Sequence, residues 1–206
     1  MPTRSATTKP EATRSTAKTS VPKTPRTRMV AADDSPARVM AEAFAVNDRM
    51  YQMILDNLDP RAWHAEPPDK GRTIAAIFAH VHNVRRKWVR LSAPHLKLPP
   101  QLDRATCTPK QAGAGLAESA ALCCKMLAAR FEHPENRIQK FVRDGWARPW
   151  TPGVAMFAYM ITHDAHHRGQ VFWLARELGY PLPRKVNYGV WNWEKLWRDC
   201  GFTQPR

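Results

Sequence analysis

The fold of this chain is decided by residues 151–178, which read TPGVAMFAYMITHDAHHRGQVFWLAREL. Thr151 and Pro152 are residue types that favour a helix start, and Gly179 stands where a left-handed cap would end the helix. Between these signals, apolar side chains recur at helical spacing and form one stripe: Met156, Met160, Leu174 and Leu178. We therefore predict a long helix from about Thr151 to Leu178 with one buried face.

Two histidines interrupt this apolar stripe. Because a helix advances about 100° per residue, His163 and His167 lie about 20° to either side of the centre of the stripe, whereas His166 lies near its edge. His163 and His167 should therefore point into the core one turn apart, a spacing at which two imidazoles can share a metal ion. Gln170 follows on the same stripe, where it could orient a ligand or simply pack with a hydrogen bond.

Three more long helices are predicted upstream. Ser35-Pro36 and Thr108-Pro109 are helix starts, the second with a capping-box glutamine at Gln111. The predicted ranges are 35–58, 73–91 and 108–131, with a short fifth helix at 190–197. We find no alternating strand pattern. Four helices of about 20 residues predict an all-α four-helix bundle.

The second predicted helix carries another pair of histidines. Its buried stripe is marked by Ile74, Ile77, Val81, Val84 and Trp88. His80 lies about 60° from the centre of this stripe and can lean inward, whereas His82 lies about 140° away and should face solvent or a neighbouring surface. The sequence therefore predicts a constellation of His80, His163 and His167; the alternative is that these are core histidines without a metal.

Three histidines would suit Zn²⁺, Ni²⁺, Fe²⁺ or Mn²⁺. Three protein ligands leave room for a water or a substrate, which is typical of catalytic rather than structural sites. A thiol or water bound there would have a lowered pKa. No separate catalytic residue can be assigned from the sequence.

The formal net charge of +14 is unevenly spread, because residues 1–28 carry +6 and few large apolar residues. Such a segment cannot bury enough surface to offset its ordering entropy, so we predict a disordered tail at 1–33 and a bundle domain at 34–206. The tail is expected to be a solubilising extension; weak attachment to nucleic acid is the alternative, and a transit peptide is the least favoured.

The sequence argues against a disulfide-rich, a membrane-spanning and a secreted protein. The four cysteines contain no CxxC pair, so we expect no disulfide framework and a reducing, cytoplasmic location. Cys123 and Cys124 are expected to be small buried hydrophobes. The longest apolar run, Val154 to Ile161, is too short to span a membrane, and no apolar segment follows the start, so no secretory signal is expected.

Two motifs carry a family resemblance. The stretch His163-Asp-Ala-His-His167-Arg-Gly-Gln170 resembles the HxxxHRGQ signature of the DinB/YfiT-like family of predicted metalloenzymes. The stretch Ile77-Phe-Ala-His80-Val-His-Asn-Val-Arg, just before Trp88, resembles the second-helix motif of that family. The segment 188–194 is similar to the end of some bacterial members, so the match covers about residues 36–200.

This resemblance implies properties that spacing does not show. The fold would be a DinB/YfiT-like four-helix bundle, often a homodimer, with a divalent metal on His80, His163 and His167. Some members are thiol-dependent S-transferases or isomerases, in which the metal activates the thiolate of a low-molecular-weight thiol. A small-molecule substrate would then be the main partner. His166 and Gln170 are the candidates for supporting the ligands.

We expect structural roles for residues next to the histidines and for the tryptophans near the C-terminus. Arg168 should form a salt bridge or a dimer contact, and Gly169 should allow close packing of another element. Asp164 could accept a hydrogen bond from the second nitrogen of a ligand, but because it neighbours His163 in sequence we expect it to point elsewhere. Three tryptophans should close the open end of the bundle: Trp191, Trp193 and Trp197.

Three functions follow from these features. The first is a metal-dependent transferase or hydrolase that activates a thiol or water. The second is a non-catalytic metal-binding stress-response protein, which a closed fourth ligand or the lack of a cleft would favour. The third is a basic nucleic-acid-associated protein, for which no recognised DNA-binding motif is present.

Overall fold

A computed structural model describes residues 35–132, 138–143, 146–150 and 154–202. The predicted disordered tail at 1–33 lies outside these residues. So does the predicted start of the fourth helix at Thr151-Pro152.

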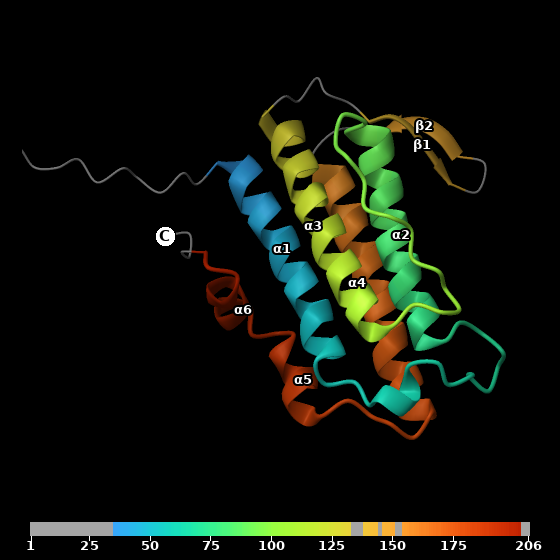
Figure 1. The fold of residues 1–206 in the computed structure, drawn as a ribbon. Helices are drawn as coiled ribbons and strands as arrows, with labels where there is room; N and C mark the ends of the chain where they lie inside the picture. Colours follow the sequence, from blue (N-terminus) through green and yellow to red (C-terminus); the bar gives the residue numbers. More distant parts are fainter. Residues whose placement is uncertain (1–34, 133–137, 144–145, 151–153, 203–206) are drawn as a thin grey trace, which may run out of the picture. The chain divides into compact units, whose positions relative to one another are not determined.

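The described residues contain four long helices: α1 (Pro36–Leu55), α2 (Ile74–Ser92), α3 (Pro109–Glu132) and α4 (Val154–Glu177). α3 packs on α1 and on α2, and α4 contacts both α1 and α2 (Figure 1). The prediction of an all-α four-helix bundle is therefore confirmed. The apolar stripes of the four helices meet in its core, where Phe78, Trp88, Leu116 and Met160 are fully or almost fully buried.

The helix starts coincide with the capping signals of the sequence. The side chain of Ser35 accepts a hydrogen bond from the Arg38 amide at 3.3 Å, which begins α1. Thr108 and Gln111 form the expected capping box, in which Thr108 Oγ1 accepts from the Gln111 amide at 3.2 Å and Gln111 Oε1 accepts from the Thr108 amide at 2.8 Å. α1 ends at Leu55, three residues before its predicted end, and a 3₁₀ turn follows at Pro60–Ala62.

A two-stranded antiparallel hairpin joins α3 to α4, where the sequence analysis predicted no strand. β1 (Ile138–Arg143) pairs with β2 (Trp146–Trp150), from Arg143 opposite Trp146 to Ile138 opposite Trp150. The sequence interpretation was wrong here because residues 138–150 show no regular alternation of apolar and polar side chains, and they include Pro149, which is unfavourable in a central strand. In a two-stranded ribbon both strands are edges, where a proline is tolerated.

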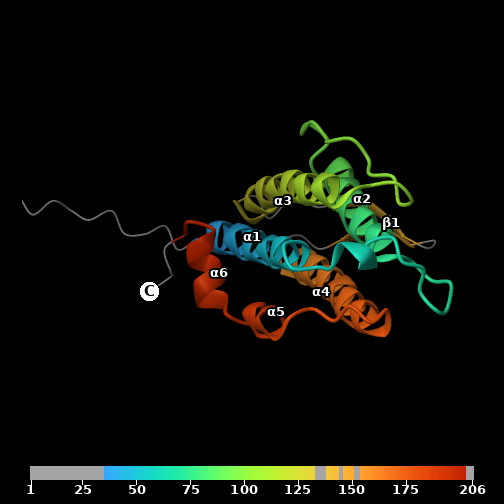
Figure 2. The same ribbon diagram turned by 60° about the horizontal axis from the view of Figure 1, so that its bottom comes forward.

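The C-terminal segment also differs from expectation. Two short helices, α5 (Arg184–Gly189) and α6 (Trp193–Asp199), replace the single helix predicted at 190–197. Figure 2 shows them on the side of the bundle formed by α1 and α4, away from α2 and α3. Trp197 packs with Val46 and Met50 of α1, as predicted for a residue that covers the bundle. Trp191 and Trp193 do not cover the bundle in this way, because their side chains are 78% and 40% exposed.

α3 is long and apolar over Pro109–Ala129. Over Pro109–Ala129 its length and mean hydropathy of 1.2 would suffice to cross a membrane, and among the described residues it is the one helix for which this holds. Its apolar side chains instead pack in the bundle core, including Ala112, Leu116, Cys123 and Leu127. We therefore interpret α3 as a core helix.

All four cysteines are free thiols, as expected from their spacing. Cys107 and Cys123 are buried, and Cys124 and Cys200 are half-buried. Burial raises the pKa of each thiol, for Cys124 to about 12. The interpretation of Cys123 and Cys124 as packed apolar residues agrees with this placement.

Two glycines allow a matched test of backbone conformation. Gly179 ends α4 with a φ of +82°, whereas Gly169 lies inside the helix, and a Cβ on either would meet nothing within 4 Å. The predicted close packing against Gly169 is therefore wrong. Gly179→Ala should lower the free energy of unfolding by about 1–2 kcal/mol, because a side chain disfavours the left-handed region. Gly169→Ala should raise it by up to about 1 kcal/mol, because alanine favours the helix.

Urea unfolding followed by circular dichroism measures both effects. Changes of the same sign in the two variants would contradict this account.

Candidate metal centre

Three histidines from two helices meet between α2 and α4. One potential ligand atom from each of His80, His163 and His167 lies within 4.8 Å of those of the other two. The ring centroids are 4.5 Å apart for His163 and His167, 4.6 Å for His80 and His167, and 5.5 Å for His80 and His163. His163 and His167 are buried and His80 is half-buried. The structure thus brings together the three residues that the sequence singled out.

Hydrogen bonds set the ring orientation of two of these histidines. His163 Nδ1 lies 3.2 Å from Asp164 Oδ1, and His167 Nδ1 lies 2.6 Å from Gln170 Oε1. Because both partners are acceptor oxygens, each Nδ1–H donates, which leaves a lone pair on Nε2. This is the tautomer that a metal-binding imidazole needs.

The third histidine has an unsatisfied atom. His80 Nδ1 is buried and has no hydrogen-bond partner among the described residues. A buried polar atom without a partner is costly, so a bound group that takes up this nitrogen would remove the cost. The three residues therefore fit a divalent cation.

The surroundings of His80 and His167 favour their uncharged form. Burial, with smaller contributions from the charges of His167 and Arg72, lowers the pKa of His80 to about 3. Burial likewise lowers the pKa of His167 to about 4, although its bond to Gln170 opposes this. Both rings are therefore uncharged near neutral pH, in the form that can coordinate a cation.

A cleft of about 280 Å³ opens onto His80 and His163. Trp88 and Tyr159 form its aromatic wall, and Lys87 and Arg104 add positive charge. Two of the three histidines, His80 and His163, are thus accessible to a small molecule from one side.

Comparison with known proteins identifies the family. The model of the DinB family matches residues 29–195. The chain belongs to the DinB family. Comparisons with curated proteins and with solved structures gave no significant match. The family assignment agrees with the two histidine motifs from which the resemblance was drawn.

In this DinB-family chain, Asp164 is fixed from three directions. Its Oδ2 accepts from Arg85 Nη2 at 2.7 Å and Nε at 3.1 Å, and from Asn47 Nδ2 at 2.7 Å. Its main-chain carbonyl accepts from the Tyr51 hydroxyl at 2.7 Å. The other carboxylate oxygen is left for His163, so the expectation that Asp164 points away from the histidines was wrong.

Arg85 is the centre of this network and is fully buried. Besides Asp164 it pairs with Asp48 Oδ1 at 2.5 Å and donates to the Leu116 carbonyl at 3.3 Å. Burial by itself would lower the pKa of Arg85, but the charges of Asp164 and Asp48 outweigh it and raise the pKa. Burial would raise the pKa of Asp164, but Arg85 and the bond from His163 keep it below the usual range.

The sequence analysis missed this network. The available signal was positional: Arg85 lies four residues after Val81 and three before Trp88, and so falls on the buried stripe of α2. A charged residue on an apolar stripe needs a buried partner of opposite charge.

The other histidines near the site have different roles. His82 was predicted to face solvent or a neighbouring surface; it is fully buried, with Nδ1 2.7 Å from the Gly115 carbonyl and Nε2 2.9 Å from the Pro100 carbonyl. The linker after α2 folds back over this side of the helix, which helical periodicity cannot reveal. His166 is exposed, with its ring centroid 5.0 Å from that of His167, and it does not join the three.

The salt bridge expected of Arg168 is not present among the described residues, and its dimer contact stays a prediction. Its guanidinium donates to Asn47 Oδ1 and lies over the Tyr51 ring, 5.3 Å from the centroid. No salt bridge to Arg168 is present in the described part of the chain.

Removing Arg85 should destabilise the bundle strongly. Arg85→Met leaves Asp48 and Asp164 without their cation in the core, so we expect a loss of about 3–5 kcal/mol in the free energy of unfolding. Arg198→Met is the matched control, because Arg198 pairs with Glu194 on an exposed surface of α6. It should cost less than about 1 kcal/mol. Equal losses in the two variants, measured by urea unfolding, would contradict a structural role for Arg85.

Proposed function

We propose that this DinB-family protein binds one divalent metal ion through His80, His163 and His167 and uses it to activate a thiol or a water molecule. The reaction would be an S-transfer or a hydrolysis on a small-molecule substrate. The proposal is carried by the hydrogen bonds of two histidines. Nδ1 of His163 bonds to Asp164, and Nδ1 of His167 bonds to Gln170. Both rings therefore present an Nε2 lone pair beside His80, whose Nδ1 has no partner among the described residues.

The donor set suggests the kind of metal. Three imidazole ligands suit Zn²⁺, Ni²⁺, Fe²⁺ or Mn²⁺ rather than Mg²⁺ or Ca²⁺, which prefer oxygen ligands. When bound, such an ion would act as a Lewis acid that lowers the pKa of a thiol or water. Asp164 and Gln170 would hold two of the ligating rings in place.

The cleft favours an enzyme over a storage or structural site. Among the described residues, no fourth histidine, cysteine or carboxylate joins the three. The cleft of about 280 Å³ reaches His80 and His163 from the open side. A site with an open position and access for a ligand is typical of catalytic metal centres.

The walls of the cleft indicate what would enter it. The Trp88 and Tyr159 rings offer apolar contact, while Arg104 and Lys87 make the entrance positive. Such a cleft favours a thiol or substrate that carries a carboxylate. The rings and the basic side chains would bind and orient this molecule beside the histidines.

Two other functions remain as alternatives. A metal-binding stress-response protein without turnover would use the same three histidines. Association with nucleic acid would depend on residues 1–33, which lie outside the described structure. A cytoplasmic location and a homodimer belong to the same proposal.

Metal content tests the site directly. The full chain, purified without an affinity tag or added metal, should contain about one divalent ion per chain by elemental mass spectrometry. His80→Ala and His163→Ala should lose it. His166→Ala is the matched control and should retain it, because His166 is exposed and outside the cluster.

Two results would contradict this proposal. One is protein that takes up no metal even after reconstitution with Zn²⁺, Ni²⁺ or Mn²⁺. The other is equal loss of metal in all three variants.

The Gln170 side chain gives a finer test. Gln170→Leu keeps all three histidines but removes the acceptor for His167 Nδ1, so metal affinity should fall by about 10- to 100-fold. Gln111→Leu is the control, because Gln111 caps α3 and should affect stability but not metal affinity. Competition with a chromogenic chelator measures both. Unchanged affinity in Gln170→Leu would assign that glutamine to packing alone.

A further inference from the structure

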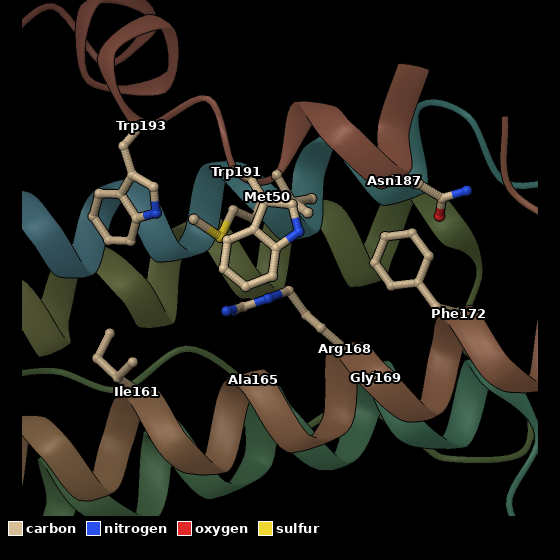
Figure 3. A pocket seen from close by; sticks show the side chains of 10 residues that line it. Met50, Ile161, Ala165, Arg168, Gly169, Phe172, Asn187, Trp191 and Trp193 are labelled. Carbon is tan, nitrogen blue, oxygen red and sulfur yellow. The ribbon is translucent and has the colours of Figure 1, made fainter. Parts of the chain in front are cut away.

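A second cavity lies on the face of α4 that points away from the histidines. It has a volume of about 510 Å³ and is bordered by α1, α4 and the segment that contains α5 and α6 (Figure 3). Ala165 and Phe172 on its wall are offset from His163 by about 160–200° around the α4 axis. The cavity and the histidine cluster are therefore separate sites on one helix.

The cavity is apolar and open. Met50, Ile161 and Phe172 line it, and Trp191 and Trp193 stand at its edge with 78% and 40% of their surface exposed. A volume of this size, lined mainly by aromatic and aliphatic side chains, is typical of small-molecule sites. Exposed indoles gain contact area when a ligand fills the space beside them.

Gly169 contributes to the open space. It lines the cavity, and a Cβ placed on it would meet nothing within 4 Å. Since a glycine inside a helix costs stability relative to alanine, the sequence keeps space here that packing does not use.

One cation faces this apolar space. Figure 3 shows the Arg168 side chain extending from α4 into the cavity, below the Trp191 ring. Arg168 donates to a neutral amide oxygen, Asn47 Oδ1, and no carboxylate in the described residues pairs with it. The nearby carboxylates of Asp48 and Asp164 are already held by Arg85.

A guanidinium that has no carboxylate partner in the described part of the chain, and that lies beside an apolar cavity, suits an anion attached to an apolar body. A guanidinium binds carboxylate and sulfonate oxygens through charge-assisted hydrogen bonds, which strengthen when water is excluded. We propose that this cavity binds a small organic anion, with its aromatic or aliphatic body against Phe172 and Trp191 and its anionic group on Arg168. This proposal does not rest on the metal proposed at the histidines.

A matched pair of probes tests the proposal on the full chain. 8-Anilinonaphthalene-1-sulfonate carries the required anion, and N-phenyl-1-naphthylamine is similar but uncharged. Fluorescence titration should give at least about tenfold tighter binding for the sulfonate, and both should quench tryptophan emission.

Variants then separate the charge from the apolar wall. Arg168→Gln should weaken the sulfonate about tenfold and leave the uncharged probe unchanged. Gly169→Leu places a larger side chain in the cavity, where its Cβ would meet none of the described residues within 4 Å, and should weaken both. Arg90→Gln removes an exposed charge on α2 and is the matched control, with no effect expected. Near-ultraviolet circular dichroism confirms that each variant is folded.

Three outcomes would overturn the proposal. The first is equal affinity for the two probes in the wild-type chain. The second is unchanged binding in Gly169→Leu. The third is sulfonate binding that occurs only as a dimer dissociates, seen by sedimentation velocity across protein concentrations. In that case the occupant of the cavity would be a second copy of the chain.

Discussion

The buried ion pairs of Arg85 are the interaction on which the rest of the structure depends. One guanidinium on α2 binds Asp48 of α1, Asp164 of α4 and a carbonyl of α3, so all four long helices meet at a single charged group. Taking three charges out of water is costly, and only near-complete pairing offsets the cost. The bundle must therefore adopt the relative helix positions that satisfy Arg85. Those positions also place His163 beside its hydrogen-bond partner.

Helical periodicity was sufficient to predict the bundle and the histidine cluster. His163 and His167 interrupt an apolar stripe, and His80 lies near the edge of another; all three side chains follow the face on which the backbone places them. The capping residues Ser35 and Thr108 were equally informative, because a cap acts within one turn of helix.

What could not be predicted depended on contacts between distant segments. His82 is buried because a linker folds over it, and periodicity describes only one helix at a time. The partners of Arg85 come from other helices, so its place on the stripe could have signalled a buried charge but not which residues neutralise it. The hairpin before α4 was missed because its strands lack the regular alternation of apolar and polar residues by which a strand is recognised in sequence.

Helix α4 therefore carries two different kinds of surface. One side presents imidazoles fixed by Asp164 and Gln170, next to a basic cleft. The other presents an apolar cavity with a single guanidinium. Because two histidines interrupt its apolar stripe, α4 is also tied to its neighbours by polar contacts, in which Arg85 of α2 and Tyr51 of α1 donate to Asp164.

Asn47 connects these two sides through a single amide. Its Nδ2 donates to Asp164 and its Oδ1 accepts from Arg168, so a flip of the amide would lose both hydrogen bonds. Any ligand that draws Arg168 away removes one of the two hydrogen bonds that fix the Asn47 amide. The remaining bond is the one to Asp164. Thermodynamic linkage makes such an effect reciprocal: if an anion in the cavity changes affinity at His163, occupation of the histidines changes affinity for the anion by the same factor.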